Sequence, residues 1–310
     1  MNLRRYIELA VLMGFVMVFC TVAHQRNFVW KDDFSLWSDA VKKSPRKARP
    51  YNNLGEACEK KGFIELAIML ARECIALDPN LAEPHNNLGI CYLDKGWIDK
   101  ALVEFKHAIK VNPNYALAHK NLGSAYHMLG KLDLSIAAFK EALRVQPYSS
   151  DAYNKLGICY LEEGHANKAV VKFKHAIRIN PDYALAHKNL GSAYYMLGQL
   201  DLAIVSVKQA LSINPYLVDA LNNIGTYYFE KGLVYEAISH FKHAIQIAPD
   251  YADAHYNLGV AYGSKGNYDM AFKEIRMAKS LAEGVQWKKI VKGINREQPK
   301  IKGHNAEKIK

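Results

Sequence analysis

The chain has 310 residues, of which half are hydrophobic and 23% are charged, a composition typical of folded proteins that excludes a disordered or fibrous chain. Its formal net charge is +11, with +4 in residues 1–47 and +6 in residues 284–310, so the residues between carry +1. A nucleic-acid-binding protein needs a basic contact surface, and this central part lacks the charge for one.

The first predicted element is an apolar run over residues 9–23 that follows two arginines. Extended back to residue 6, the run has about 18 residues, which is near the length that crosses the hydrocarbon of a bilayer. Phe28 and Trp30 follow as aromatic residues suited to a membrane interface. A signal peptide cleaved near Ala23 and a buried helix are the alternatives. We predict a transmembrane anchor within residues 1–25.

Flanking charges predict the orientation of this anchor. Basic residues are enriched on the cytoplasmic side of a membrane-spanning segment. Arg4, Arg5 and the amino terminus lie directly before the segment, whereas Arg26 and Lys31 follow it at a greater distance. The sequence therefore predicts a single-pass membrane protein with a cytoplasmic N-terminus, whose remaining residues lie outside the cytoplasm in a periplasm or lumen.

Residues 26–47 are predicted to form a linker and one helix. The spacing from Pro45 to Pro79 equals one period of the repeat described next, and the spacing from Trp37 to Phe105 equals two periods. Trp37 and Pro45 therefore occupy the positions at which the second helix of a repeat has an apolar residue and its closing proline. The segment is interpreted as the second half of a two-helix unit whose first helix is missing.

A period of about 34 residues runs through most of the chain, which is within the range of repeat lengths found in solenoid proteins. One glycine recurs at this spacing at Gly55, Gly89, Gly123, Gly157, Gly191, Gly225 and Gly259. A second recurs at Gly62, Gly96, Gly130, Gly164, Gly198, Gly232 and Gly266. Prolines recur at Pro79, Pro113, Pro147, Pro181, Pro215 and Pro249. Three series in the same register indicate an array of repeats, which is a different architecture from a pair of globular domains.

Each repeat is predicted to be a helical hairpin. In the second repeat, apolar and small residues recur at helical spacings of three and four, at Leu88, Gly89, Tyr92, Ala101, Phe105 and Ala108. Gly96 lies between the two sets and supplies a turn, and Pro113 ends the second helix because its ring cannot continue the hydrogen-bond ladder. A glycine inside a helix costs about 1 kcal/mol relative to alanine, so Gly89 implies close approach of the two helices.

This pattern resembles the tetratricopeptide repeat, whose consensus has small residues at positions 8, 20 and 27, tyrosine at 11 and proline at 32. The resemblance covers residues 48 to about 281 and implies an all-α fold. It implies an α-solenoid, a right-handed superhelix of seven hairpins over residues 48–283, preceded by the half-repeat and closed by a capping helix. Hairpins of this kind cannot bury their apolar faces alone, so they are stabilised by stacking.

The C-terminal residues are predicted to form a cap and a tail. Residues 284–297 contain Trp287, Ile290, Val291 and Ile294 at helical spacing, which favours an amphipathic helix lying against the last hairpin. Residues 298–310 are rich in lysine and lack apolar periodicity, so we expect a disordered basic tail. Contact with anionic lipid or an acidic partner is the alternative to a solvated tail.

Residues 26–55 are similar to a junction in a second family, the glycosyltransferase-like membrane proteins that carry transmembrane and tetratricopeptide regions. In that family the last membrane span leads into a lumenal or periplasmic repeat array. The multi-span catalytic part of the family has no counterpart in this sequence. The resemblance therefore supports the predicted orientation and does not carry over the transferase activity.

No motif in the sequence predicts catalysis. The recurring histidines share repeat positions 4 and 26, are separated by whole repeats, and are interpreted as packing residues rather than metal ligands. Cys58 and Cys74 could pair in an oxidising compartment, although small buried thiols are the favoured interpretation of the cysteines. We therefore predict that the protein is not an enzyme and that it uses no metal, no cofactor and no small-molecule substrate.

The family resemblance also implies where a partner would bind. Positions 2, 5, 6, 9, 12 and 13 of the first helices line a concave groove in such arrays, and position 6 is asparagine in every repeat but the fourth, which has Lys155. An amide both donates and accepts hydrogen bonds, so this series suits the backbone of an extended peptide. The predicted groove residues are Asn53, Asn87, Lys120, Asn121, Lys188, Asn189, Tyr195, Asn223, Phe229 and Asn257. Packing between adjacent hairpins is the structural alternative for these asparagines.

Together these patterns predict a membrane-tethered scaffold for protein–protein interaction, with extended peptide segments or partner proteins bound in its groove. The alternative is an accessory or split-off, non-catalytic part of a membrane glycosyltransferase system. The predicted partners are proteins or peptides in the groove and a membrane at the N-terminal segment, and no nucleic acid is expected.

Overall fold

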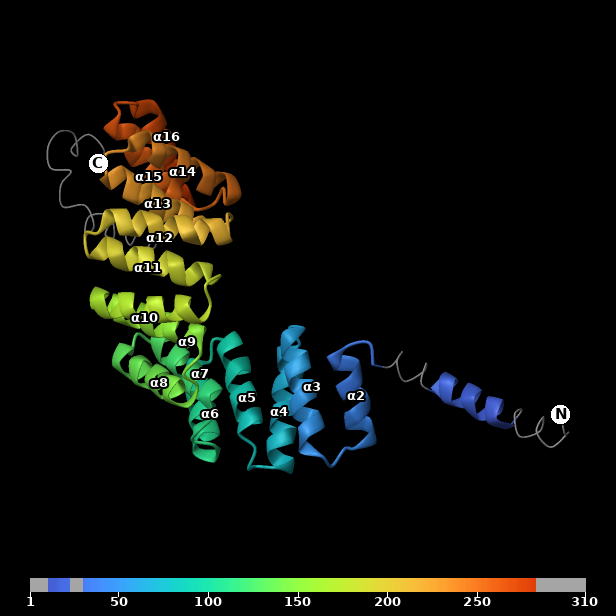
Figure 1. Cartoon of the computed structure of the whole chain (residues 1–310). Helices are drawn as coiled ribbons and strands as arrows, with labels where there is room; N and C mark the ends of the chain where they lie inside the picture. Colours follow the sequence, from blue (N-terminus) through green and yellow to red (C-terminus); the bar gives the residue numbers. More distant parts are fainter. Residues whose placement is uncertain (1–10, 23–29, 283–310) are drawn as a thin grey trace. The chain divides into compact units, whose positions relative to one another are not determined.

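A computed structural model describes residues 11–22 and 30–282 of the chain, and every regular element in these residues is a helix (Figure 1). The first lies at residues 11–22 and is followed by α2 (Asp33–Lys43). Helices α3 to α16 then form seven hairpins, which confirms the all-α fold predicted from the repeat period. The predicted capping helix at 284–297 and the predicted tail at 298–310 lie outside the described residues.

The helix bounds of the hairpins repeat closely. The first three hairpins are α3 (Ala48–Lys60) with α4 (Ile64–Leu77), α5 (Ala82–Asp94) with α6 (Ile98–Val111), and α7 (Ala116–Met128) with α8 (Leu132–Val145). The last four are α9 (Ser150–Glu162) with α10 (Ala166–Ile179), α11 (Ala184–Met196) with α12 (Leu200–Ile213), α13 (Val218–Glu230) with α14 (Val234–Ile247), and α15 (Ala252–Ser264) with α16 (Tyr268–Leu281).

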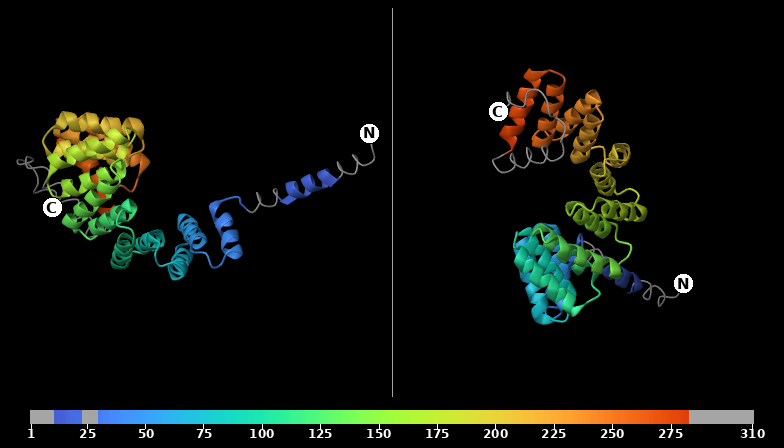
Figure 2. Two further views of the ribbon diagram at one scale, coloured as in Figure 1. Left: turned by 60° about the horizontal axis from the view of Figure 1, so that its bottom comes forward. Right: turned by 90° about the vertical axis from the view of Figure 1, so that its left-hand side faces the viewer.

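The chain divides into two compact units inside the repeat region, an N-terminal unit of residues 1–148 and a C-terminal unit of residues 149–310. In the N-terminal unit each helix from α2 to α8 packs against the next, and the first helices α3, α5 and α7 also contact their neighbours. The C-terminal unit repeats this arrangement from α9 to α16 (Figure 2). The first helices of each unit therefore lie side by side along one of its faces.

The second glycine series makes the turn inside each hairpin. Gly96 adopts a φ of 72°, in the left-handed region that a residue with a Cβ rarely occupies. Its N–H donates to the carbonyl oxygen of Leu93 at 2.8 Å, and the N–H of Trp97 donates to that of Tyr92 at 2.8 Å. This pair of bonds is a Schellman motif, which satisfies the last carbonyls of α5 and turns the chain into α6.

The first glycine series lets the two helices of a hairpin touch. A Cβ added to Gly89 would lie 2.5 Å from Cε1 of Phe105, which is fully buried. Ala101 on α6 is fully buried in the same core cluster as Phe105, and Ala108 is fully buried beside Ala82 of α5 and Ala118 of the next hairpin. The close approach packs the Phe105 ring against the α5 backbone. This packing offsets the free-energy cost of placing glycine, which has a low helix propensity, inside a helix.

Helix α2 covers the start of the stack, in the place predicted for a half-repeat. Asp32 caps it by accepting a hydrogen bond from the N–H of Ser35 at 2.8 Å, and Ser35 Oγ accepts from the N–H of Asp32 at 3.2 Å. Phe34 and Trp37 on this helix pack against the core of the first hairpins. One amphipathic helix is therefore sufficient to cover the apolar face that α3 would otherwise expose.

The predicted single-pass membrane localisation is wrong. Within residues 11–22 and 30–282, no helix has both the length and the apolar composition needed to cross a bilayer. The predicted extracytoplasmic placement of the repeats, which rested on this span, loses its basis as well.

Candidate protein-binding groove

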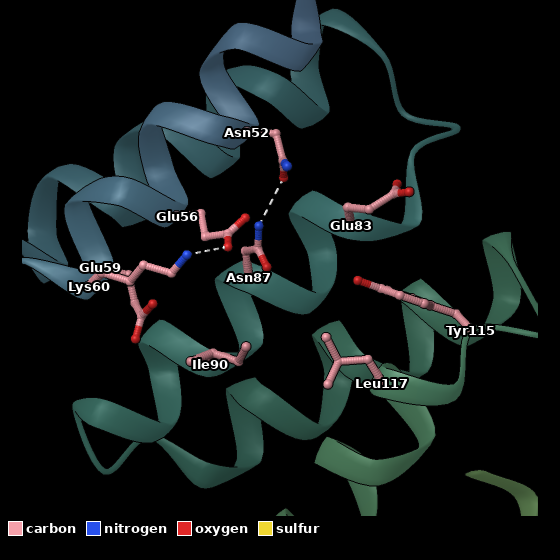
Figure 3. A pocket seen from close by; sticks show the side chains of 9 residues that line it. All are labelled: Asn52, Glu56, Glu59, Lys60, Glu83, Asn87, Ile90, Tyr115 and Leu117. Atoms are coloured by element: carbon pink, nitrogen blue, oxygen red, sulfur yellow. Dashed lines mark hydrogen bonds and ion pairs between the residues drawn. The ribbon is translucent and has the colours of Figure 1, made fainter. Parts of the chain in front are cut away.

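The first helices of the N-terminal unit line an open pocket with a volume of about 190 Å³ (Figure 3). Its lining residues are Asn52, Glu56, Glu59 and Lys60 on α3, Glu83, Asn87 and Ile90 on α5, Leu117 on α7, and Tyr115 just before α7. All of these except Tyr115 occupy repeat positions 2, 5, 6, 9, 12 or 13. The pocket therefore lies on the face for which the repeat pattern predicts a groove, and we refer to it as the groove pocket.

An amide pair forms the wall of the groove pocket. Asn87 on α5 donates from Nδ2 to Oδ1 of Asn52 on α3 at 3.0 Å, the bond drawn between these side chains in Figure 3. Asn121 on α7 donates in the same way to Asn86 on α5 at 2.9 Å. These bonds link the first helices of adjacent hairpins, so the asparagines at position 6 have the structural role that was the alternative to peptide binding.

The C-terminal unit contains the same series of bonds. Asn189 donates to Asn154, and Asn257 donates to Asn222, both at 2.9 Å. Asn223 donates to Oγ of Ser192 at 3.3 Å. In each asparagine pair the acceptor lies at position 5 of the preceding repeat. An amide nitrogen has two hydrogens and its oxygen has two lone pairs, so one such bond leaves hydrogen-bonding capacity where the side chain meets solvent.

The remaining predicted groove residues are placed as follows. Asn53 lies at the start of the series and accepts from Asn52 at 3.3 Å. Lys188 lies 3.7 Å from a carboxylate oxygen of Asp219. Tyr195 stacks on Tyr227 with ring centroids 4.7 Å apart. Phe229 is half-buried against the core of the C-terminal unit, and Lys120 is half-buried on α7. Whether these residues bind a ligand stays a prediction.

The groove pocket has more negative than positive charge. Glu56, Glu59 and Glu83 supply three carboxylates, and Lys60 supplies one ammonium group, which pairs with Glu56 at 2.8 Å. Burial raises the pKa of Glu59, and the nearby charge of Asp94 adds to this shift. The same two causes, burial and nearby carboxylates, raise the pKa of Tyr115 to about 12. A cation placed in the pocket would relieve the repulsion among these groups.

Glu83 is the exposed carboxylate in this pocket that lacks a partner among the described residues, and the half-buried Glu59 has no hydrogen bond or ion pair with them either. Figure 3 shows the side chain of Glu83 on the same side of the pocket as the hydroxyl end of Tyr115. Sequence reasoning missed Glu56, Glu59 and Glu83, although all three occupy groove positions, because it followed the asparagines at position 6 and a few lysine and aromatic residues at positions 5 and 12.

A second cluster lies inside one hairpin of the N-terminal unit. His85 on α5 contacts Glu104 and His107 on α6, and one potential ligand atom from each of the three lies within 4.8 Å of the others. The recurrence of histidine at positions 4 and 26 had indicated residues separated by whole repeats. However, positions 4 and 26 of the same repeat face each other across the hairpin. The presence of both His85 and His107 in the second repeat was the sequence signal that could have indicated this cluster.

The cysteines of the repeats are inert. Cys58, Cys74 and Cys91 are free and buried, and Cys159 is buried, in agreement with the favoured interpretation as small core residues. Burial raises the pKa of the Cys74 thiol to about 11 and that of Cys91 to about 12. Because the thiolate is the reactive form, these side chains pack in the core and take no part in the groove.

Comparison with known families identifies repeats along most of the chain. Models described as TPR repeat or tetratricopeptide repeat match residues 48–81, 70–103, 91–130, 116–149, 138–171, 159–198, 184–217, 227–266 and 252–284. One curated relative is the protein O-mannosyl-transferase Tmtc3 of Drosophila melanogaster, with 31% identity over 68 residues. This match covers 22% of the chain and 7% of the relative, so it includes only a small part of that protein.

Solved structures share the fold at low sequence identity. A chain of the APC/C hetero-tetramer Cut9–Hcn1 gives a TM-score of 0.66 with 21% identity, covering 77% of this chain and 48% of the other. PilW, a type IV pilus biogenesis factor, gives 0.61 with 19% identity, covering 68% and 98%. PilF of Pseudomonas aeruginosa gives 0.58 with 15% identity, covering 68% and 97%. At these identities the likeness concerns the fold alone.

Proposed function

The chain belongs to the tetratricopeptide repeat family, and from this premise we propose that it is a scaffold that holds an extended segment of a partner protein in the groove pocket of its N-terminal unit. A protein-interaction role is common to the fold. The assignment to this groove rests on one observation: eight of the nine lining residues project from the first helices at the positions that form one face of the stack.

The proposed segment lies with its backbone along the amide side chains. Asn87 uses one amide hydrogen for Asn52, and it is half-buried rather than enclosed, so its second amide hydrogen can donate to a peptide carbonyl. The paired amides hold each other in place before the ligand arrives. A preorganised donor loses less side-chain entropy on binding than a mobile one, which supports a role in binding as well as in packing.

The charge of the groove pocket favours a cationic side chain on the segment. Glu83 has no partner among the described residues, and Glu59 is partly desolvated, so a lysine or arginine side chain would form an ion pair that the free protein lacks. Ile90 and Leu117 provide apolar surface for the methylene groups of such a side chain. We therefore propose that the bound segment is extended and carries at least one basic residue.

The proposed role includes no chemical step. The described residues consist of tetratricopeptide hairpins and the helices beside them, and the groove pocket presents amides, carboxylates and aliphatic groups that suit binding. The match to the O-mannosyl-transferase covers too little of that enzyme to favour an accessory role in glycosyl transfer over a general scaffold.

Selection from a random peptide library displayed on phage, followed by anisotropy titration with the selected peptides, tests the proposal on the full chain. Leu117→Arg places a bulky cation in the groove pocket and is expected to weaken binding by at least about tenfold, or 1.4 kcal/mol. The matched control is Leu134→Arg, because Leu134 on α8 has a similar exposure, 47% against 39%, and does not line the pocket. Equal binding to both variants would place the site elsewhere.

A further inference from the structure

The hairpin of α5 and α6 brings together three side chains that are typical metal ligands. Nδ1 of His85 lies 2.8 Å from Oε2 of Glu104, and the rings of His85 and His107 meet edge to face with centroids 5.4 Å apart. The side chains of His85 and Glu104 are 12% and 18% exposed, and His107 is exposed. The cluster is thus partly desolvated on one side and open to water on the other.

His85 differs from the other histidines at its repeat position. His119, His187 and His255 each direct Nε2 at the backbone carbonyl oxygen of the proline six residues earlier, at 2.9, 2.9 and 3.0 Å. This contact fastens the start of the first helix to the preceding turn and explains why histidine recurs there. The structure describes both His85 and Pro79, and His85 makes no such bond to this proline. The ring of His85 instead forms its hydrogen bond with Glu104.

The last hairpin provides an internal comparison. His255 lies 2.6 Å from Glu274, so the pair formed by His85 and Glu104 has a counterpart there. The residue equivalent to His107 in that hairpin is Met277, whose thioether is a poor ligand for a borderline divalent metal ion. Only the second hairpin therefore combines the histidine–glutamate pair with a third nitrogen ligand.

The distances suit coordination after a small movement. A tetrahedral site with metal–ligand bonds near 2.0–2.1 Å places its ligand atoms about 3.3 Å apart. His85 and Glu104 are already closer than this, so a metal ion would replace the hydrogen that they share. The ligand atoms now lie within 4.8 Å of one another, and the exposed His107 can close the remaining gap by side-chain rotation.

We propose that His85, Glu104 and His107 form a binding site for a divalent transition metal ion, with the chemistry of Zn²⁺. Two imidazoles and one carboxylate match the ligand preference of this ion, and a water molecule completes the tetrahedron on the exposed side. The ion ties α5 to α6 within one hairpin. This site does not depend on the groove pocket, which is lined from α5 by Glu83, Asn87 and Ile90.

The test uses the full chain purified without a histidine tag and dialysed against a chelator. Calorimetry with Zn²⁺ and absorption spectroscopy with Co²⁺ are expected to show one tight site per chain, and Zn²⁺ is expected to raise the Tm by a few degrees. His107→Met installs the residue that the last hairpin has, and it is expected to remove this site while leaving the histidine–glutamate pair and the helical circular dichroism intact.

Two further variants complete the test. Glu104→Gln keeps the shape of the side chain and loses its charge, so it is expected to weaken Zn²⁺ binding at least about tenfold. His255→Gln is the control, because it changes the counterpart pair in the last hairpin and should leave both stoichiometry and affinity unchanged. Equal Zn²⁺ binding by the wild type and His107→Met, or no saturable binding by the wild type, would overturn the proposal.

Discussion

The two units differ in the contacts of an acidic residue at repeat position 2, which is Asp219 in the C-terminal unit and Glu83 in the N-terminal unit. In the C-terminal unit, Asp219 accepts a hydrogen bond from the hydroxyl of Tyr251 at 3.0 Å and lies 3.7 Å from the ammonium group of Lys188. In the N-terminal unit, Glu83 occupies the equivalent position and forms neither kind of contact with the described residues. Tyr115 precedes α7 as Tyr251 precedes α15, yet its hydroxyl makes no hydrogen bond to Glu83.

The residue at position 5 of the preceding repeat accounts for part of this difference. Lys188 supplies a cation beside Asp219, whereas Asn52 stands at the corresponding place before Glu83 and uses its carboxamide for Asn87. The C-terminal unit thus has a cation beside Asp219, although Asp253 at position 2 of its last repeat has no such partner among the described residues. The N-terminal unit has no such cation beside Glu83, so two copies of one repeat pattern differ in groove charge through a single position.

The largest expected effect concerns the cores of the two units. Phe105→Ala empties a fully buried site in the N-terminal unit and is expected to lower the free energy of unfolding by about 3–5 kcal/mol. Val207 occupies the same repeat position in the C-terminal unit and is also fully buried, and Val207→Ala should cost roughly half as much because fewer carbon atoms are lost. Urea denaturation measures both values. A larger loss for Val207→Ala would contradict the packing argument.

The next effect tests the groove charge directly. Asn52→Lys gives the N-terminal unit the cation that the C-terminal unit has at Lys188, and it should weaken binding of a basic peptide about tenfold, or 1.4 kcal/mol. Anisotropy titration with a library-selected peptide measures this change. Asn80→Lys is the matched control, because it adds the same charge on the exposed turn between α4 and α5. Equal losses would mean that only the net charge of the unit matters.

A smaller effect is expected from the tyrosine hydroxyls. Tyr251→Phe removes the hydrogen bond to Asp219 and should cost about 0.5–1.5 kcal/mol of unfolding free energy. Tyr115→Phe should change the stability little, because Glu83 accepts no bond from this hydroxyl. Thermal unfolding of the two variants gives the comparison. A loss of the same size for Tyr115→Phe would show that the two tyrosines contribute alike.

The smallest effect is a pH dependence. Burial raises the pKa of Glu59 above its usual 4.5, so its contribution to stability is present at low pH and is lost as the pH rises through the raised pKa. A bound cation favours the charged carboxylate instead. The affinity for a basic peptide should therefore fall as the pH is lowered through this raised pKa. Glu59→Gln should flatten this profile, and an unchanged slope would exclude Glu59 as its source.

The repeat architecture could be predicted because its signals are local. The glycine turn between helices, the proline after the second helix and the helical spacing of Leu88, Phe105 and Ala108 act over a few residues, and each appears as expected. The membrane span could not be predicted in this way. Hydrophobicity along residues 9–23 measures transfer to an apolar phase, and within residues 11–22 and 30–282 no helix has both the length and the apolar composition to cross a bilayer.

The functional residues were predicted only in part. The series of asparagines at position 6 was visible in the sequence, and Asn87 lines the groove pocket. Its bond to Asn52 was not visible, because that bond joins side chains of two different repeats whose distance depends on how two hairpins stack. The same limit hid the convergence of Glu56 and Glu83 from adjacent helices.

The amino-acid sequence alone specifies the repeating unit of this protein, a helical hairpin with a glycine contact at its centre that occurs seven times in succession. Hydrogen-bond ladders, turn geometry and side-chain volume act within one hairpin, so periodicity is enough to reveal them. Tertiary packing settles which groups meet, namely Asn52 with Asn87, Glu83 with the groove pocket, and His85 with Glu104 and His107. These contacts depend on the angle and separation of packed helices, and a period in the sequence specifies neither.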